Sequence, residues 1–169
     1  MAYNVGDRIL YGAVGIMEIV DISEQTVAGM QKQYYILKEL GSISDSHTYV
    51  PLDNARLMAA MHPLLSSEEI YALIERAPEI SALEWVENNR ARAEKYKEIM
   101  ELGDRGAIIA MVKSISNMAN ERAAIGKKNY IADDTAKKRA CHLLYSEVSL
   151  VLGIPESEAE ALIKKQSWF

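Results

Sequence analysis

The amino-acid sequence predicts an α+β protein, in which a small N-terminal β barrel of the SH3-like or Tudor-like type precedes a compact all-α region of about five helices. Two observations predict this arrangement. Before residue 60, apolar residues alternate or cluster in short runs, whereas after Pro63 they recur with the 3.6-residue period of helices. The chain has 169 residues, of which 49% are hydrophobic, so two small cores can be buried. We therefore expect two domains, residues 1–60 and residues 61–169.

Four apolar runs in the first 60 residues are typical of short β-strands. They are Arg8–Tyr11, Ile16–Ile22, Gln31–Leu40 and Thr48–Val50. Gly12 and Gly15 punctuate the turn after the first run, and Pro51 ends the last one. Short strands with closely spaced turn signals are typical of small barrels and sandwiches, so this region is expected to form one.

Capping signals predict where the first helices begin and end. A capping box at Ser66–Glu69 predicts a helix that runs to about Arg76. A second capping box at Ser81–Glu84 predicts a long helix that continues through about Leu102. Gly103 is expected to end this second helix, because glycine adopts the left-handed conformation that closes many helices.

Three further helices complete the predicted all-α region. Asp104 is expected to cap the first, and five apolar residues at helical spacing form its buried face. These residues are Ile108, Ile109, Met111, Val112 and Ile115. Asp133 or Asp134 is expected to begin the next helix, which runs through Leu152. Pro155 suits the first turn of a short last helix.

Charge and composition limit the classes of partner. The net charge is −5, which argues against a protein that binds nucleic acid over its whole surface. Residues 85–139, however, contain 12 basic and 8 acidic side chains, and this is the one segment where a DNA contact is expected. No apolar run is long enough to span a membrane, and Cys141 is the one cysteine, so we expect a cytoplasmic protein without a disulfide or a membrane partner.

The sequence offers little of the chemistry that an enzyme needs. Its histidines lie far apart, and the adjacent pair Cys141–His142 points in directions about 100° apart on a helix, which suits no metal ion. Gly12–Gly15 is not followed by the lysine and hydroxyl residue of a phosphate-binding loop. We therefore expect no catalysis, no cofactor, no metal and no small-molecule substrate.

Three blocks of the N-terminal region resemble one known family. They are Val5–Tyr11 with Gly15, then Gly29–Lys38, and finally Tyr49–Ala55. Their order and spacing over about 55 residues resemble the CarD/CdnL family of bacterial transcription regulators. The resemblance implies a Tudor-like domain that binds the β-subunit of RNA polymerase through an exposed strand edge.

The resemblance also indicates which residues would contact the polymerase. Family members often have arginines at the positions of Gln25 and Tyr49, and neither arginine is present here. The contact would then depend more on the strand backbone, which needs no particular side chain. The candidate polymerase-binding residues are Gln25, Tyr49, Val50 and Pro51.

The C-terminal half resembles the helical domain of the same family more loosely. In that family a tryptophan with basic neighbours contacts the upstream edge of the melted promoter and stabilises the open complex, and Glu84–Arg92 is the matching stretch here. The candidate DNA-binding residues are Trp85, Asn88, Asn89, Arg90 and Arg92, together with Lys127 and Lys128 of a later loop. The residues directly after Trp85 are not basic here, and positive charge resumes only at Arg90 and Arg92.

Several alternatives remain open at this stage. Trp85 can be an exposed wedge or a core residue, because tryptophans are usually well buried. The lysines can be phosphate contacts or merely solvated side chains. Trp168–Phe169 can dock on the helices or stay free. The competing function is a protein-interaction adaptor in which the helices are scaffold only and touch no DNA.

Overall fold

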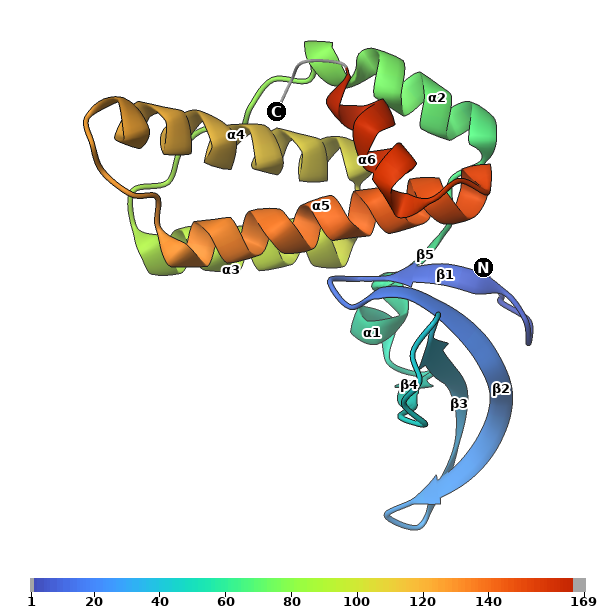
Figure 1. Ribbon diagram of the computed structural model, residues 1–169. Helices are drawn as coiled ribbons and strands as arrows, with labels where there is room; N and C mark the ends of the chain where they lie inside the picture. Colours follow the sequence, from blue (N-terminus) through green and yellow to red (C-terminus); the bar gives the residue numbers. More distant parts are fainter. Residues whose placement is uncertain (1, 166–169) are drawn as a thin grey trace. The chain divides into compact units, whose positions relative to one another are not determined.

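The computed structural model describes residues 2–165, and its chain divides into two compact units, Met1–Leu64 and Leu65–Phe169. The first unit is a β-sheet domain and the second is all-helical, so the predicted α+β class is confirmed (Figure 1). The sheet includes residues 61–63, which lie after the domain boundary expected at residue 60. The terminal pair Trp168–Phe169 lies outside the described residues.

The N-terminal unit is a five-stranded antiparallel sheet in the order β4-β3-β2-β1-β5. Its strands are β1 (Arg8–Tyr11), β2 (Gly15–Val27), β3 (Met30–Glu39), β4 (Thr48–Pro51) and β5 (Met61–Pro63). The four strands that the sequence predicts are confirmed. The short helix α1 (Ala55–Ala59) and strand β5 were not predicted, because three to five residues are too few to display a period.

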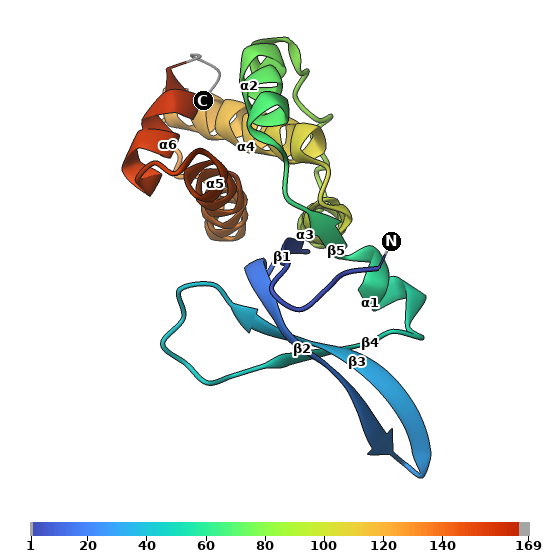
Figure 2. The same cartoon turned by 90° about the vertical axis from the view of Figure 1, so that its right-hand side faces the viewer.

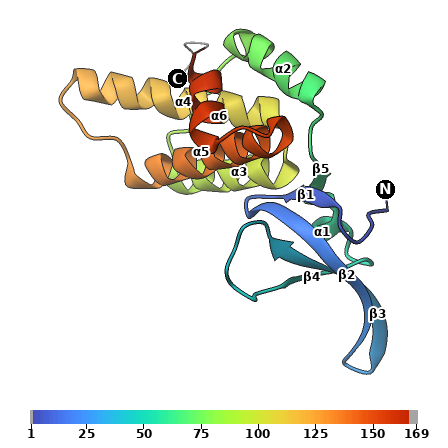
Figure 3. The same ribbon diagram turned by 45° about the vertical axis from the view of Figure 1, so that its right-hand side comes forward.

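The longest element of this unit is the β2–β3 hairpin. Ala28 and Gly29 form its two-residue turn, and both have positive φ angles, as the tight hairpin turns of twisted strands require. A bulge between Ile19 and Asp21 shifts the register and adds twist. Because β4 pairs only with residues 34–37 of β3, the distal half of the hairpin projects beyond β4 (Figure 3).

One face of the sheet forms the core of the N-terminal unit. Its buried members, all apolar or aromatic, are Ile9, Tyr11, Met17, Ile19, Tyr35, Leu37, Val50 and Met61. The alternation along β3 places Tyr35 and Leu37 on this face and Tyr34 and Ile36 on the other. The core therefore fixes which side chains of β3 and β4 face away from it.

The helical unit begins as the sequence predicts. Helix α2 (Ser67–Arg76) has Ser66 as its N-cap, and the reciprocal capping box with Glu69 is formed. The Ser66 side chain accepts a hydrogen bond from the Glu69 amide, and the hydrogen bonds lower the pKa of the Glu69 carboxyl. A short 3-10 helix (Ala77–Glu79) follows, where Pro78 prevents continuation of the α-helix.

The next helix starts later than the sequence predicts. Helix α3 (Asn89–Leu102) is capped by Asn88, and residues 81–86 are not helical, so the helix predicted from the Ser81–Glu84 capping box is wrong over its first two turns. Its predicted end is confirmed, since Gly103 closes it in the left-handed conformation with φ 63°. Trp85 therefore lies in an extended segment ahead of α3.

Three longer helices build the rest of the unit: α4 (Arg105–Ala124), α5 (Ile131–Leu152) and α6 (Glu156–Lys164). Asp104 caps α4 as predicted, and the five apolar residues predicted for its face are all buried. Helix α5 begins at Ile131, two or three residues before the predicted start at Asp133 or Asp134, and Gly153 ends it. Figure 2 views α5 nearly end-on, with α6 beside it.

Candidate nucleic-acid and polymerase interfaces

The extended segment that contains Trp85 is fixed through its backbone. Lys113 of α4 donates hydrogen bonds from Nζ to three carbonyl oxygens, among them that of Ile80 at 2.7 Å. The amide of Leu83 donates to the carbonyl of Ala110 at 3.1 Å. These groups of the segment bond to α4 instead of to a helix of their own, which explains why the second capping box does not start one.

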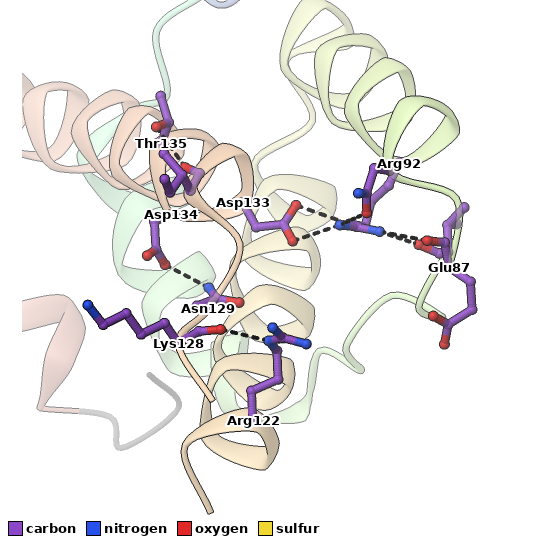
Figure 4. Close-up of polar contacts among 11 residues, drawn as sticks. Glu87, Arg92, Arg122, Lys128, Asn129, Asp133, Asp134 and Thr135 are labelled. Atoms are coloured by element: carbon purple, nitrogen blue, oxygen red, sulfur yellow. Dashed lines mark hydrogen bonds and ion pairs between the residues drawn. The ribbon is translucent and has the colours of Figure 1, made fainter. Parts of the chain in front are cut away.

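Arg92 fixes the other end of the segment. Its guanidinium donates two hydrogen bonds to the Asp133 carboxylate, at 3.0 and 2.9 Å. It donates to the carbonyls of Val86 and Glu87 at 2.7 and 3.2 Å, and to Oδ1 of Asn89 at 2.8 Å. Figure 4 shows the guanidinium between the carboxylate on α5 and the backbone before α3. All five N–H groups of the arginine therefore have acceptors.

This geometry corrects one sequence prediction. Arg92 is only 2% exposed, so its guanidinium is not accessible to a phosphate group, and the expectation that it contacts DNA directly is wrong. Burial alone would lower the pKa of Arg92, but the hydrogen bond and the charge of Asp133 outweigh burial and raise it. Arg92 and Asp133 are both buried and pair with each other, so neither side chain presents a free charge on the surface of residues 85–139.

Trp85 lies against an aromatic partner that the sequence does not suggest. Its ring stacks near Tyr130, with ring centroids 6.4 Å apart and planes inclined by 24°. The guanidinium carbon of Arg92 lies 4.2 Å from the Trp85 centroid, and that of Arg122 lies 4.1 Å from the Tyr130 centroid. Trp85 is half-buried, so it is neither the fully exposed wedge nor the core residue that the sequence left as alternatives.

The contact with Tyr130 brings the loop between α4 and α5 to the Trp85 segment. Arg122 holds this loop, because its Nε donates to the carbonyl of Lys128 at 2.9 Å. Both Lys127 and Lys128 are exposed, and the Lys128 side chain extends away from Arg122 (Figure 4). Two candidate DNA-binding groups more than 40 residues apart are thus adjacent.

The remaining candidates at the start of α3 divide into structural and available groups. Oδ1 of Asn88 accepts the Ala91 amide at 2.9 Å and caps α3, while Oδ1 of Asn89 accepts from Arg92. Arg90 is exposed on the first turn. We call the exposed or half-exposed residues of this region the aromatic–basic surface. It consists of Trp85, Asn88, Asn89, Arg90, Lys127, Lys128 and Tyr130.

Sequence reasoning missed Tyr130 and Asp133 as members of this site. An aromatic residue two positions after a pair of lysines was visible, but nothing in the pattern linked it with a tryptophan 45 positions earlier. Asp133 resembled an ordinary acidic residue in the first turn of a helix, where it favours the helix dipole. Only the packing of α3 against α5 turns it into the partner of Arg92.

The candidate polymerase-binding residues lie on β2 and β4. Gln25 pairs with Lys32 and Tyr49 pairs with Ile36, and alternation along β3 places both on the face away from the core. Tyr49 is 48% exposed and packs edge-to-face on Tyr34, with centroids 6.4 Å apart. Gln25 and Tyr49 therefore share one face of the sheet.

Val50 and Pro51 play different parts. Val50 is fully buried, so its side chain is a core residue and is not available to a partner, contrary to its selection as a contact. The Leu52 amide donates to the Gln33 carbonyl at 2.9 Å, so by alternation Val50 directs its backbone groups to β3 and Tyr49 directs its own outward. Pro51 has no amide hydrogen. The edge of β4 thus offers the N–H and C=O of Tyr49.

Other reactive groups in the structure are few. Burial raises the pKa of the Cys141 thiol, which makes it a poor nucleophile. Within residues 2–165, no group of three or more histidine, cysteine, aspartate or glutamate side chains is placed to hold a metal ion. No helix in the described part of the chain combines the length and apolar character needed to cross a membrane.

Comparison with protein families identifies the N-terminal unit. Residues 3–64 match a family model described as the CarD-like/TRCF RID domain. The matched range spans all five strands and α1, and it ends at the boundary of the first compact unit. The match thus covers the N-terminal unit and leaves the helical unit to be interpreted from its own geometry.

Proposed function

We propose that the protein is a regulator that holds the polymerase β-subunit and promoter DNA together. The proposal starts from residues 3–64, which belong to the CarD-like/TRCF RID family of RNA polymerase-interacting domains. The RID domain is a non-catalytic interaction module and gives the chain a transcription-related role. In the proposal the helical unit contacts the upstream edge of the promoter bubble and stabilises the open complex.

The exposed edge of β4 supports the polymerase contact. An extended strand of the β-subunit can add to this edge and bond to the outward N–H and C=O of Tyr49, with Gln25 and the ring of Tyr49 on the adjoining face. Backbone bonds need no arginine, so the family arginines absent at these two positions are not essential to such a contact. Binding is expected to be weaker than with them.

The edge contact has a direct test. Tyr49→Pro removes the outward amide hydrogen and keeps an extended backbone, whereas Tyr49→Ala removes the ring and keeps that hydrogen. In a pull-down with polymerase β-subunit fragments, we expect Tyr49→Pro to lose most binding and Tyr49→Ala to lose part of it. Equal and complete retention by both variants would place the interface elsewhere on the domain.

The aromatic–basic surface supports the DNA contact. The observation that carries it is the half-exposed ring of Trp85 against Tyr130, since the loop before Tyr130 contains exposed Lys127 and Lys128 and the first turn of α3 contains exposed Arg90. An aromatic ring next to cations suits a melted promoter, because it can stack on an unpaired base while the cations bind phosphates. Arg92 has no direct part in this contact, since it is buried.

Open-complex lifetime tests this contact. With polymerase and a promoter, Trp85→Ala is expected to shorten the lifetime roughly 5- to 150-fold, the range that corresponds to the loss of one stacked base. The matched control is Tyr71→Ala, which removes an aromatic ring that is 55% exposed on α2 of the same unit. Tyr71→Ala should leave the lifetime unchanged. If the open-complex lifetime is the same for both variants and the parent protein, the proposed DNA contact is wrong.

A protein-interaction adaptor is the second candidate, and the overall charge of −5 favours it. An adaptor binds the polymerase through β4 but shows no dependence of open-complex lifetime on Trp85 or on the exposed lysines. The two functions therefore agree on the pull-down and differ on the lifetime.

A further inference from the structure

We propose that Arg92 is a positioning residue for Trp85, which sets the orientation of the ring rather than touching DNA itself. The inference about orientation stands on the geometry of the helical unit alone. Its consequence for transcription rests on the proposed function, in which Trp85 contacts the melted promoter.

The first supporting observation is the number of bonds that the guanidinium makes to the Trp85 segment. Two of its five donors are bound by Asp133, which anchors the group to α5. The other donors bind the two carbonyls that follow Trp85 and the first residue of α3, Asn89. The chain on the C-terminal side of Trp85 is thereby tied to a fixed point outside its own segment.

The second observation is the position of the guanidinium relative to the rings. Its carbon lies 4.2 Å from the centroid of Trp85 and 5.1 Å from that of Tyr130. Arg92 therefore contacts the face of the indole with its guanidinium and also binds the backbone directly after Trp85. A lysine has three donors on a flexible stem and no planar group, so it cannot make the same set of contacts.

The alternative is that Arg92 only stabilises the helical unit and does not position Trp85. A second arginine–carboxylate pair in the same unit allows the two roles to be compared. Arg105 and Glu147 form this second pair, with two bonds of 2.9 and 2.6 Å, in which the carboxylate is buried and the arginine is partly buried. Arg105 also donates to the carbonyl of Gly103, in the turn that starts α4. Arg105→Lys thus disturbs a comparable pair that binds the backbone at Gly103, whereas Arg92 binds it at Val86 and Glu87.

Fluorescence of Trp85 separates positioning from stability. A Trp168→Phe background leaves Trp85 as the single tryptophan of the full-length protein. Well below the melting temperature, we expect Arg92→Lys to raise the acrylamide quenching constant about twofold, because the ring loses its cation and its fixed backbone. Arg105→Lys should leave quenching as in the parent. Equal quenching constants in folded Arg92→Lys and Arg105→Lys would overturn the proposal.

Should Arg92→Lys fail to fold, Asp133→Asn provides the same measurement. Asparagine has the size of the Asp133 side chain and keeps one acceptor oxygen, but it lacks the charge. The quenching constant should therefore rise, by less than in Arg92→Lys. Unchanged quenching in folded Asp133→Asn would likewise contradict a positioning role.

Open-complex lifetime then tests the consequence for transcription. Arg92→Lys is expected to shorten the lifetime toward that of Trp85→Ala, while binding to the β-subunit fragment stays unchanged. The two proposals fail in different ways. If Trp85→Ala leaves the lifetime unchanged, the DNA contact fails, but a rise in quenching in Arg92→Lys still supports positioning. If Trp85→Ala shortens the lifetime and Arg92→Lys changes neither quantity, the positioning role is wrong and the DNA contact stands.

Discussion

Two arginine–carboxylate pairs in the helical unit are alike in chemistry and different in surroundings. Arg92 and Asp133 join α3 to α5, and Arg105 and Glu147 join α4 to α5. In each pair two nitrogens of the arginine meet both carboxylate oxygens. The second carboxylate also accepts the amide of Leu65 at 3.0 Å, and so fixes the start of the unit.

The difference lies in what each pair holds. Glu147 and Arg105 fix the backbone at Leu65 and Gly103, where the chain enters the unit and turns between helices. Arg92 instead fixes an irregular segment with a half-exposed tryptophan. The same ion pair can therefore support the fold in one place and shape a surface in another, and sequence alone does not distinguish the two uses.

The largest expected effect comes from removing either carboxylate. Asp133→Ala leaves the buried Arg92 guanidinium without its charged partner, which typically costs about 3–5 kcal/mol in the free energy of unfolding. Glu147→Ala leaves the partly buried Arg105 guanidinium with the Gly103 carbonyl as an acceptor, so its cost should not exceed that range. Chemical denaturation of the full-length protein measures this cost. Equal losses would show that the pairs are equivalent for stability. A loss below about 1 kcal/mol for either variant would contradict its burial in the folded unit.

The next effect is a loss of unfolding free energy at alkaline pH that comes from a tyrosine next to the Arg92–Asp133 pair. Burial raises the pKa of Tyr96, one turn after Arg92, to about 12. An unfolded tyrosine loses its proton near pH 10, so between pH 10 and 12 the folded state keeps more protons. The free energy of unfolding should fall by about 2–3 kcal/mol as the pH rises through this window and then level off.

Tyr96→Phe tests this origin, because phenylalanine has no phenolic proton to lose. The variant should lack the part of the alkaline fall in unfolding free energy that comes from Tyr96. Denaturation curves at several pH values between 9 and 12 provide the measurement. Tyr71→Phe on the exposed face of α2 is the control and should behave as the parent. An unchanged pH dependence in Tyr96→Phe would assign the alkaline loss to other groups, among them Tyr145, whose pKa burial also raises.

A smaller effect on stability is expected for Trp85, whose ring contacts Arg92 of the first pair. Trp85→Ala removes a half-buried indole and its contact with the Arg92 cation, which together should cost about 1–2 kcal/mol of stability. Thermal and chemical unfolding measure it. A cost of about 3–5 kcal/mol would instead identify Trp85 as a core residue. A neutral result would mean that the contact with Arg92 contributes nothing measurable.

The smallest effects are expected for exposed basic side chains that belong to neither ion pair. Arg90→Gln, Lys127→Gln and Lys128→Gln should each reduce the slope of log K against log salt for promoter binding by about 1, if each contacts one phosphate. Lys97→Gln is the control, because Lys97 is exposed on α3 and lies 3.9 Å from Glu101. A slope that changes as much in the control as in the three variants would mean that binding reflects only the overall charge.

Two serine-acidic patterns show where sequence reasoning succeeds and where it stops. The boxes at Ser66–Glu69 and Ser81–Glu84 have the same spacing, and only the first starts a helix. Local hydrogen bonds satisfy the first box. At the second, Lys113 and Arg92 donate hydrogen bonds to backbone carbonyls, and the Leu83 amide donates to the Ala110 carbonyl. These long-range bonds outweigh the local signal.

Sequence by itself determined the fold class, the four longer strands, the helix ends at Gly103 and Gly153, and the buried face of α4. These features depend on short-range periodicity and on the backbone preferences of single residues. Only the tertiary structure decided that Arg92 is buried, that Val50 is a core residue and that Trp85 meets Tyr130. Those outcomes depend on which residues the packing of distant segments brings together, and no local pattern encodes that pairing.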